Sequence, residues 1–414
     1  MNEERFKIID EMTEEELDSL TESEYDEYLK IKYERLTDHD AAIEELLADI
    51  NAAQQGALPV WPTGFPALDE KLDGGFLAGN LILLGAISSL GKTTFALQVA
   101  ENIALSGRDV IVFSLEMSKK ELFAKSISRN TYRIVDAETR EKPRIHYTDE
   151  SYRLAMGDSL RGRVGLLGEP KRELFERALE ETNKLKAHLR IVRDNNMSVD
   201  RIETLTRAHE LVTGRKPFLL VDYLQILKHG NDARGDKRML TDEDVNKLKD
   251  LAVRRNVPIM VISSFNRNNY FEPASMGSFK ESGTIEYSSD VLIAMQYSGM
   301  QYQKHYFTPQ GGRRKKVYES TQDHNTRVRE LLEKMDEDGA AGKSLPVDVV
   351  ILKNRGVSKG KILFEFIPKF NYFSEKPDQS ETARRAYDWG EDEVEAGASP
   401  VVSRGNVVIG EKIK

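Results

Sequence analysis

The stretch that most constrains this chain is residues 81–94, LILLGAISSLGKTT. Its first four residues form the short apolar run expected of a strand that is buried on both faces, and a small Gly- and Ser-rich loop follows them. A helix is predicted from Thr94 to Ala104, so the loop leads into a helix N-terminus. Backbone N–H groups and the helix dipole converge on anionic oxygens in this layout, which predicts a phosphate-binding loop.

The residue types of the loop suggest individual roles. Lys92 is expected to reach the β- and γ-phosphates, and the Thr93 hydroxyl is expected to bind Mg²⁺. The other residues expected to bind the nucleotide are Ala86, Ser88, Ser89, Gly91 and Thr94. The usual pattern GxxxxGK[ST] begins with Gly, whereas this chain has Ala86 there and Gly85 one residue earlier. The motif alone is therefore weak, and an ordinary strand-to-helix turn is the alternative interpretation.

Composition limits the class of protein. A chain of 414 residues can bury one large α/β core with appendages, or two domains. Without a long apolar run, and with an acidic N-terminal region, the sequence argues against a membrane span, a secretory signal and a basic transit peptide. Cysteine is absent, which excludes disulfides and thiolate metal sites. We expect a cytoplasmic ATPase with no membrane partner.

Charge is distributed unevenly along the chain. The net charge is −9, but residues 1–50 hold 18 Asp and Glu against 5 Lys and Arg, and residues 374–414 hold 9 against 6. Residues 51–373 consequently carry a net charge of +7. A basic central segment permits a partner with a phosphate backbone.

Two further apolar strands are each followed by a carboxylate. Residues 109–114 (DVIVFS) precede Glu116, and we expect their strand to lie beside the strand of the phosphate loop. Glu116 would then orient the water that attacks the γ-phosphate, although a cap of the helix that starts at Ser118 is the alternative. Residues 218–224 (FLLVDYL) deliver Asp222 at a strand end, as in a Walker B motif that supports Mg²⁺.

Polar residues also flank two later strands. Ser264 follows residues 258–263 (PIMVIS), at a place where a side chain can respond to the γ-phosphate. The strand predicted at residues 290–296 is preceded by Lys280, Glu281 and Gly283. That loop either meets a phosphate chain through its backbone or is a plain surface turn.

A last strand, residues 347–353 (VDVVILK), runs into Asn354 and Arg355. Lys353 and Arg355 are two residues apart, so both point to one face if the strand continues. Two cations without an acidic neighbour in sequence suit the γ-phosphate of an adjacent subunit's nucleotide. Residues 361–368 are predicted to be the hairpin partner of this strand.

The N-terminal part is expected to lie outside the core, which we place at residues 62–373. Residues 1–37 form an acidic arm that is either helical or partly disordered. Residues 38–61 contain a predicted helix from Asp40 to Gln54 with an apolar face made of Ile43, Leu46, Leu47 and Ile50. This face either docks on a neighbouring subunit or packs on its own core.

Two insertions and a tail complete the predicted organisation. Residues 132–186 and 298–344 are polar segments within the core domain, and each contains a charged helix. The second includes residues 311–316 (GGRRKK), which either contact nucleic acid or are solvated. Residues 374–414 are expected to form a flexible tail.

In their order, these motifs resemble those of the DnaB-like replicative helicases, in their C-terminal RecA-type motor domain. The matching segments, from Pro62 to about Phe373, are TGF with LD, SSLGKTTFA, FSLEM, VDYLQ, NVPIMVIS with FNR, KESGTIEYSSD and LKNRG. The resemblance implies an α/β fold: a RecA-like P-loop NTPase core whose mostly parallel central sheet is flanked by helices. It also implies a ring, usually a hexamer, that hydrolyses ATP with Mg²⁺ at subunit boundaries while it translocates on single-stranded DNA and unwinds duplex.

The resemblance assigns roles to individual residues. In the nucleotide site, Lys92 and Thr93 would bind phosphate and Mg²⁺, Glu116 would activate water and Asp222 would support the metal. Lys353 and Arg355 would be inserted into the site of the neighbouring subunit. The loop that tracks DNA would contain Lys280, Glu281 and Gly283, and residues 40–54 would be the linker helix that docks on the neighbour.

Two departures from the family pattern are visible. Ser264 stands where the family usually has Gln, and it is too short to reach a γ-phosphate directly. We also expect the helical N-terminal domain to be replaced by the acidic arm, so that a primase or loader partner does not transfer directly, as in a helicase of a phage or mobile element. The alternative function is that of a RecA-, KaiC- or RadA-like oligomeric ATPase that serves assembly or signalling without unwinding.

Overall fold

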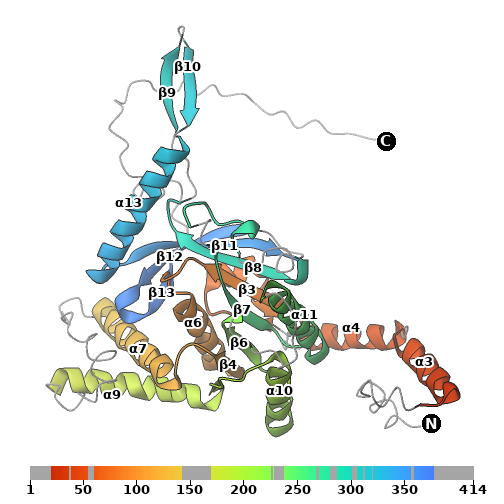
Figure 1. The fold of residues 1–414 in the computed structure, drawn as a ribbon. Helices are drawn as coiled ribbons and strands as arrows, with labels where there is room; N and C mark the ends of the chain where they lie inside the picture. The colour runs from red at the N-terminus through yellow and green to blue at the C-terminus, as the bar shows by residue number, and fades with distance from the viewer. Residues whose placement is uncertain are drawn as a thin grey trace, which may run out of the picture.

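The computed structural model describes residues 20–36, 39–54, 60–141, 169–224, 227, 237–266, 270–279, 287–300, 305–310, 313–318, 320–355 and 359–376. They form an α/β body from which an N-terminal helical arm and a β-hairpin project (Figure 1). None of the helices in these ranges is both long enough and apolar enough to cross a bilayer.

A single large sheet lies at the centre of the body. Among the described residues it has nine strands in the order β13-β12-β11-β8-β3-β7-β6-β4-β5. The strands are β3 (Leu81–Ala86), β4 (Val110–Ser114), β5 (Leu189–Val192), β6 (Phe218–Asp222), β7 (Ile259–Ser264), β8 (Val291–Tyr297), β11 (Leu345–Asn354), β12 (Gly360–Ile367) and β13 (Tyr372–Glu375). The six from β8 to β5 pair in parallel, and β11, β12 and β13 extend them as an antiparallel meander. The predicted, mostly parallel α/β sheet is confirmed.

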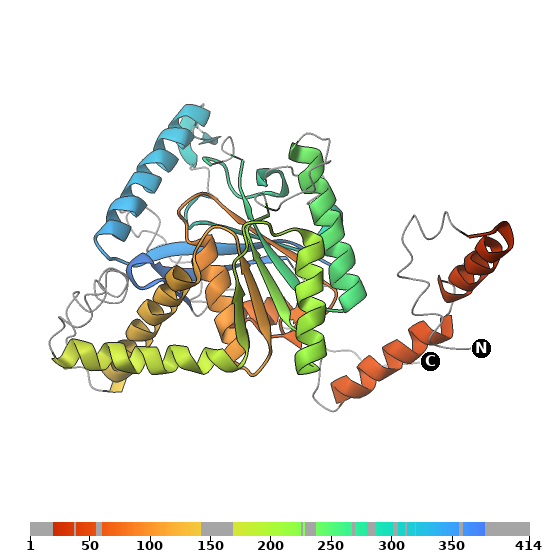
Figure 2. The ribbon, with the colours of Figure 1, turned by 60° about the horizontal axis from the view of Figure 1, so that its bottom comes forward.

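Helices cover both faces of the parallel strands (Figure 2). On one face lie α6 (Lys92–Leu105), α7 (Lys119–Glu141) and α9 (Glu169–Lys184); on the other lie α10 (Val199–Thr213) and α11 (Lys237–Arg255). Strands β3, β6 and β8 are buried along their whole length. Burial on both faces explains why these strands are continuous apolar runs instead of alternating patterns.

Helix α7 is longer than its sequence suggested. It continues to Glu141, so the first ten residues of the insertion predicted at 132–186 are helical, and α9 is the charged helix expected near its end. The Tyr132 ring packs 5.1 Å from Phe370 and 4.8 Å from Tyr372, measured between ring centroids. The apolar partners that stabilise this part of α7 therefore come from residues far away in sequence.

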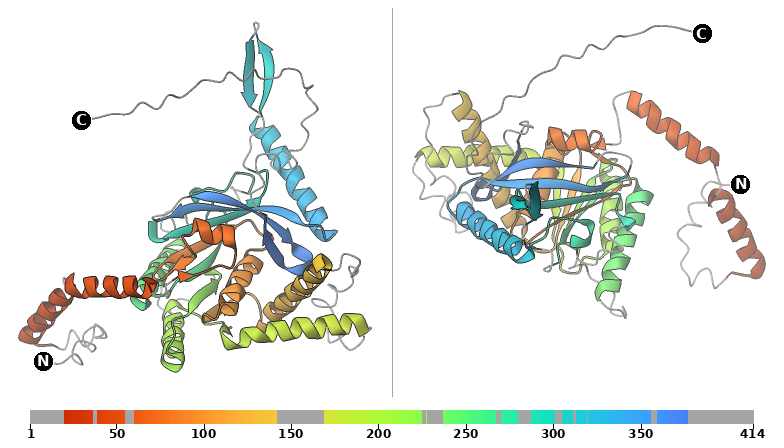
Figure 3. Two further views of the ribbon diagram at one scale, coloured as in Figure 1. Left: turned by 180° about the vertical axis from the view of Figure 1, so that it is seen from behind. Right: turned by 90° about the horizontal axis from the view of Figure 1, so that it is seen from above.

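Three elements lie at the periphery. Helices α3 (Glu22–Leu36) and α4 (His39–Gln54) extend away from the sheet, and the hairpin of β9 (His305–Gln310) and β10 (Arg313–Tyr318) projects beyond one end of α13 (Thr321–Ala340) (Figures 1 and 3). The hairpin was not predicted, whereas the charged helix after it was. The shorter elements are α5 (Pro66–Lys71), β1 (Val60–Trp61), β2 (Phe76–Leu77), η3 (Leu185–Ala187), η6 (Met276–Ser278) and η7 (Pro368–Phe370).

Candidate nucleotide site

The predicted phosphate loop joins β3 to α6 at the carboxyl edge of the parallel strands. Gly91, the residue before α6, has a φ of +86°, and a Cβ there would lie 2.8 Å from the Phe366 ring, so only glycine fits. The Lys92 Nζ atom donates hydrogen bonds to the carbonyls of Ala86 and Ile87 at 3.0 and 2.9 Å. The Lys92 side chain therefore lies across the phosphate loop, and its ammonium group lies next to the Ala86 carbonyl.

Asp222 ends β6 at the same edge and is 2% exposed. Burial raises its pKa to about 6, the Thr93 hydroxyl lowers the pKa by hydrogen bonding, and the charge of Glu116 raises it further. Its Oδ2 atom is buried without a hydrogen-bond partner among the described residues. A desolvated, under-coordinated carboxylate beside a threonine hydroxyl fits the oxygen ligands that Mg²⁺ prefers.

Glu116 lies beside Asp222, although the expected strand order was wrong. Strand β4 is not adjacent to β3, because β7 and β6 lie between them. It pairs with β6 instead, with Ser114 opposite Asp222 and the Leu115 N–H bonded to the Asp222 carbonyl at 2.8 Å. Glu116 is exposed, and its charge raises the pKa of both Asp222 and Tyr223, so it lies close to Asp222 at the same edge of the sheet.

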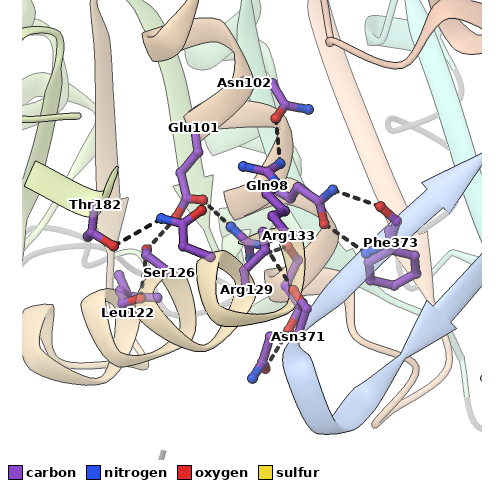
Figure 4. A network of polar contacts seen from close by, with 12 residues as sticks. Gln98, Glu101, Asn102, Leu122, Ser126, Arg129, Arg133, Thr182, Asn371 and Phe373 are labelled. Atoms are coloured by element: carbon purple, nitrogen blue, oxygen red, sulfur yellow. Dashed lines mark hydrogen bonds and ion pairs between the residues drawn. The ribbon is translucent and has the colours of Figure 1, made fainter. Parts of the chain in front are cut away.

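A buried polar network braces the first turn of α6 against α7 and β13 (Figure 4). Arg129 on α7 is fully buried; its guanidinium pairs with Glu101 on α6 and donates to the carbonyls of Asn371 and Thr94, at 2.9 and 3.3 Å. The Ser126 hydroxyl also donates to Glu101. An arginine at this depth requires acceptors, and each of its three nitrogens has one.

The same polar network also includes Lys125 and Gln98. Half-buried Lys125 donates to the Thr94 hydroxyl at 3.2 Å and to the Asn371 side chain at 2.8 Å, and burial lowers its pKa to about 8. Gln98 on α6 exchanges two hydrogen bonds of 2.8 Å with the backbone of Phe373. No local pattern in the sequence marks these residues, because their partners lie up to about 275 positions away.

Ser264 ends β7 next to the phosphate loop, opposite Ala86 in the sheet. The next residue, Phe265, packs against Phe279, with ring centroids 5.2 Å apart. A Cβ at Gly85 would lie 2.3 Å from the Phe279 ring, so the glycine before the loop makes room for this pair. The predicted DNA loop follows Phe279 directly, but Lys280, Glu281 and Gly283 lie outside the described residues.

Lys353 and Arg355 lie at the opposite edge of the sheet. Strand β11 is antiparallel to β8, so its carboxyl end pairs with Val291 at the start of β8, level with the start of β3. Since β3 advances about 3.3 Å per residue, roughly 17 Å separates this edge from the phosphate loop. Neither cation can reach the nucleotide site of its own chain.

Both cations converge on the segment before β8. Lys353 donates to the Ser289 carbonyl at 2.5 Å, and Arg355 donates to the Tyr287 carbonyl at 3.1 Å. The Arg355 guanidinium also lies 3.5 Å from the Asp290 carboxylate. The sequence showed no acidic residue near this pair, but the fold supplies one from 65 positions earlier in the chain.

The family model described as "DnaB-like helicase C terminal domain" matches residues 61–375. This chain belongs to the DnaB-like helicase family. It is 25% identical over 334 residues to the replicative DNA helicase DnaB of Helicobacter pylori (strain J99), covering 79% of this chain and 62% of that protein. It is also 25% identical to DnaB of Geobacillus stearothermophilus over 256 residues, covering 61% and 50%. The chain thus spans less than two thirds of the length of these DnaB relatives.

Two solved structures share the fold. One is an isolated ATPase domain, which superposes with a TM-score of 0.56 at 21% identity, over 81% of this chain and 99% of that one. The other is a DnaB-like replicative helicase solved for its interactions with primase, which superposes with a TM-score of 0.55 at 21% identity, over 80% and 66%. The predicted family and the RecA-like DnaB motor fold are confirmed, and the roles of individual site residues remain predictions.

Proposed function

We propose that this protein is an ATP-driven DNA helicase motor that works as a ring, translocates on single-stranded DNA and separates duplex. The observation that carries this proposal is the division of the predicted nucleotide site between two edges of one sheet. The phosphate loop, Glu116 and Asp222 gather at the carboxyl edge, while Lys353 and Arg355 gather at the other. A complete site then requires two copies of the chain, arranged head to tail, which generates a ring when the rotation closes.

Hydrolysis would use the residues of both copies. The N–H groups of the loop and Lys92 would hold the β- and γ-phosphates of ATP, and Thr93 and Asp222 would hold Mg²⁺, which neutralises charge on the phosphate oxygens. Glu116 would accept a hydrogen bond from the attacking water and orient it in line with the γ-phosphate. Arg355 of the adjacent copy would stabilise the charge that develops on the transferred phosphoryl group.

Coupling to DNA would run through a steric contact. Ser264 is too short to sense the γ-phosphate directly, but Phe279 touches Gly85 at the base of the phosphate loop and immediately precedes the predicted DNA loop. A shift of the loop on phosphate release would therefore move Phe279, because packed cores shift as units. In this proposal the Phe265–Phe279 pair couples the nucleotide site to DNA, which is the role expected of the Gln that the family usually has at the position of Ser264.

Ring assembly would use helix α4. Its apolar residues Ile43, Leu46, Leu47 and Ile50 are 44 to 59% exposed, and the helix stands away from the body of its own chain (Figure 3). An exposed apolar stripe of this size supports docking on a neighbouring copy, the first of the two alternatives that the sequence left open. Six subunits, and a primase or loader partner, are expectations taken from the family.

The family match disfavours the alternative of a RecA-, KaiC- or RadA-like ATPase without unwinding activity. The two functions differ in one measurable property. A non-unwinding ATPase would form nucleotide-dependent rings and leave a forked substrate intact, whereas the proposed motor separates its strands.

The proposal is tested by ATPase assays with and without oligo-dT, followed by unwinding of a labelled fork. Wild-type protein should show DNA-stimulated hydrolysis and unwinding, and Lys92→Ala should lose at least about 100-fold in hydrolysis because the phosphate charge loses its fixed partner. Lys184→Ala, which removes an exposed lysine on α9, is the matched control and should behave as wild type. Undiminished hydrolysis by Lys92→Ala would contradict the assignment of the loop.

A further inference from the structure

The β9–β10 hairpin is the element that the proposed motor leaves unused. It forms its own two-stranded sheet, separate from the central sheet, with six residue pairs from Arg313↔Gln310 to Tyr318↔His305. It projects beyond the body in each of two opposite views (Figures 1 and 3). A two-stranded ribbon is marginally stable by itself, so a binding partner would stabilise this one.

The sequence of the hairpin indicates the chemistry of that partner. Residues 305–318 (HYFTPQGGRRKKVY) contain no Asp or Glu, and residues 313–316 are four consecutive cations in a chain with a net charge of −9. By strand alternation, Arg313 and Lys315 occupy register positions on one face of β10, and Arg314 and Lys316 on the other. Cations on both faces of a protruding ribbon suit a surface of closely spaced phosphates, as the backbone of duplex DNA provides.

Helix α13, which follows the hairpin, is fixed to the part of the chain that leads to the predicted DNA loop. Val328 is fully buried and Met335 is 5% exposed, so one side of α13 belongs to the core. At its first turns, His324 Nε2 lies 3.2 Å from the Phe271 carbonyl, and the Arg329 guanidinium lies 5.8 Å from the Phe271 ring. Helix α13, which follows the hairpin in the chain, therefore contacts the segment 270–279 that precedes the predicted DNA loop in sequence.

We propose that the β9–β10 hairpin is a second DNA-binding element, which holds the backbone of the duplex ahead of the strand that passes through the ring. The proposal rests on the proposed helicase function for its context. A two-stranded ribbon has the width that the major groove of B-DNA accommodates. Binding by phosphate contacts is independent of sequence, as a motor that moves along DNA requires.

The test compares fork and duplex binding of two variants by fluorescence anisotropy over a range of salt concentrations. In the first variant Arg313, Arg314, Lys315 and Lys316 are changed to Gln; in the control, the exposed cations Lys184, Lys186, Arg190 and Arg193 are changed to Gln. The hairpin variant should lose at least about tenfold in affinity for a 20-bp duplex and for forks, and up to about 3.6 in the slope of log K against log salt concentration, since each lost phosphate contact accounts for about 0.9. The control should retain both, and ATPase stimulated by oligo-dT should be unchanged in both variants.

Two double variants, Arg313→Gln with Lys315→Gln and Arg314→Gln with Lys316→Gln, then show which face of the ribbon meets the phosphates. Unchanged duplex affinity in the fourfold hairpin variant would overturn the proposal, as would an equal loss in the control, which would indicate a general effect of net charge. If the fourfold hairpin variant loses rings in sedimentation but each remaining ring binds duplex with unchanged affinity, the proposal is also overturned. The hairpin would then be a contact between subunits. Failure of the helicase proposal shows separately as absent oligo-dT-stimulated ATPase, which duplex binding does not require.

Discussion

The two edges of the central sheet differ in how their charges are balanced. At the carboxyl edge, Asp222 is buried with an oxygen that lacks a hydrogen-bond partner among the described residues, and its pKa is raised because Thr93, Lys92 and Lys125 offset only part of the cost of burial. At the amino edge, Lys353 and Arg355 already have carbonyl acceptors, and Arg355 lies near Asp290. Among the described residues, the carboxyl edge therefore holds a carboxylate whose burial is incompletely compensated, whereas the cations of the amino edge have acceptors within the chain.

This difference teaches how an active site can be divided between copies at low cost. Arg355 is about 60% exposed and lies 3.5 Å from Asp290, and this buried carboxylate keeps a closer ion pair with Lys249 at 2.7 Å. Movement of the Arg355 guanidinium to a phosphate on a neighbouring copy would thus cost the chain little stability. The carboxyl edge would gain far more, because cations there would relieve a desolvated carboxylate.

The largest expected effect comes from Arg355→Ala, which tests whether the two edges belong to one site. It should lower kcat for ATP by about 1,000-fold, as expected for an arginine that acts on the transition state. Mixing it with Lys92→Ala should restore activity up to about one quarter of the wild-type rate, since that fraction of interfaces in a mixed ring combines an intact loop with an intact arginine. ATPase assays of the mixture measure this rescue. A mixture as inactive as its two components would contradict the proposal that the two edges of the sheet form one site.

Asp222→Asn tests the difference between the two edges, because it removes the buried charge at the carboxyl edge. Asp222 has a folded pKa of about 6 against a reference value of 3.8, so protons favour the folded state, and the penalty for burying the charge grows as pH rises from 3.8 to 6. The variant should be more stable than wild type by about 3 kcal/mol at pH 7.5 and by about half as much at pH 5, while losing hydrolysis. Urea unfolding at both pH values measures the difference; a variant less stable than wild type at pH 7.5 would contradict it.

A smaller effect is expected from Phe279→Leu, which tests whether the carboxyl edge communicates with DNA. Loss of ring contact beside Gly85 should reduce the stimulation of ATPase by oligo-dT several-fold and leave basal hydrolysis nearly intact, since the contact of Phe279 with the loop is to its backbone at Gly85. Phe364→Leu, at another fully buried site, should destabilise the fold by a similar amount, about 1–2 kcal/mol, without affecting stimulation. Equal stimulation in both variants would argue against the steric coupling.

The sequence predicted those features that are encoded locally. Continuous apolar runs identified β3, β6 and β8, because strands covered on both faces need no polar alternation, and Gly91-Lys92-Thr93 marked the helix start that follows. Asp222 and Glu116 were expected at one edge, and they are coupled there. Their neighbourhood was predictable because carboxyl ends of parallel strands share an edge whatever the strand order.

Features that depend on long-range contacts were not predictable. The strand order was wrong for β4, since nothing local to residues 109–114 records that the chain passes over two strands between β3 and β4. Asp290 as the neighbour of Arg355, and Arg129 with its acceptors on α6 and at Asn371, arise only when distant segments meet. The hairpin was missed because its basic, polar composition lacks the apolar alternation that marks a strand packed on a core.

The packing of Gly91 against Phe366 and Phe373 has a consequence for biogenesis. Phe366 and Phe373, which lie against the phosphate loop, are translated roughly 280 residues after it, which at 5–20 residues per second is a delay of about 15 to 60 s. During this interval the apolar underside of the nascent loop would be uncovered. In the proposed function, competence for ATP would thus be acquired only when β12 and β13 have been translated.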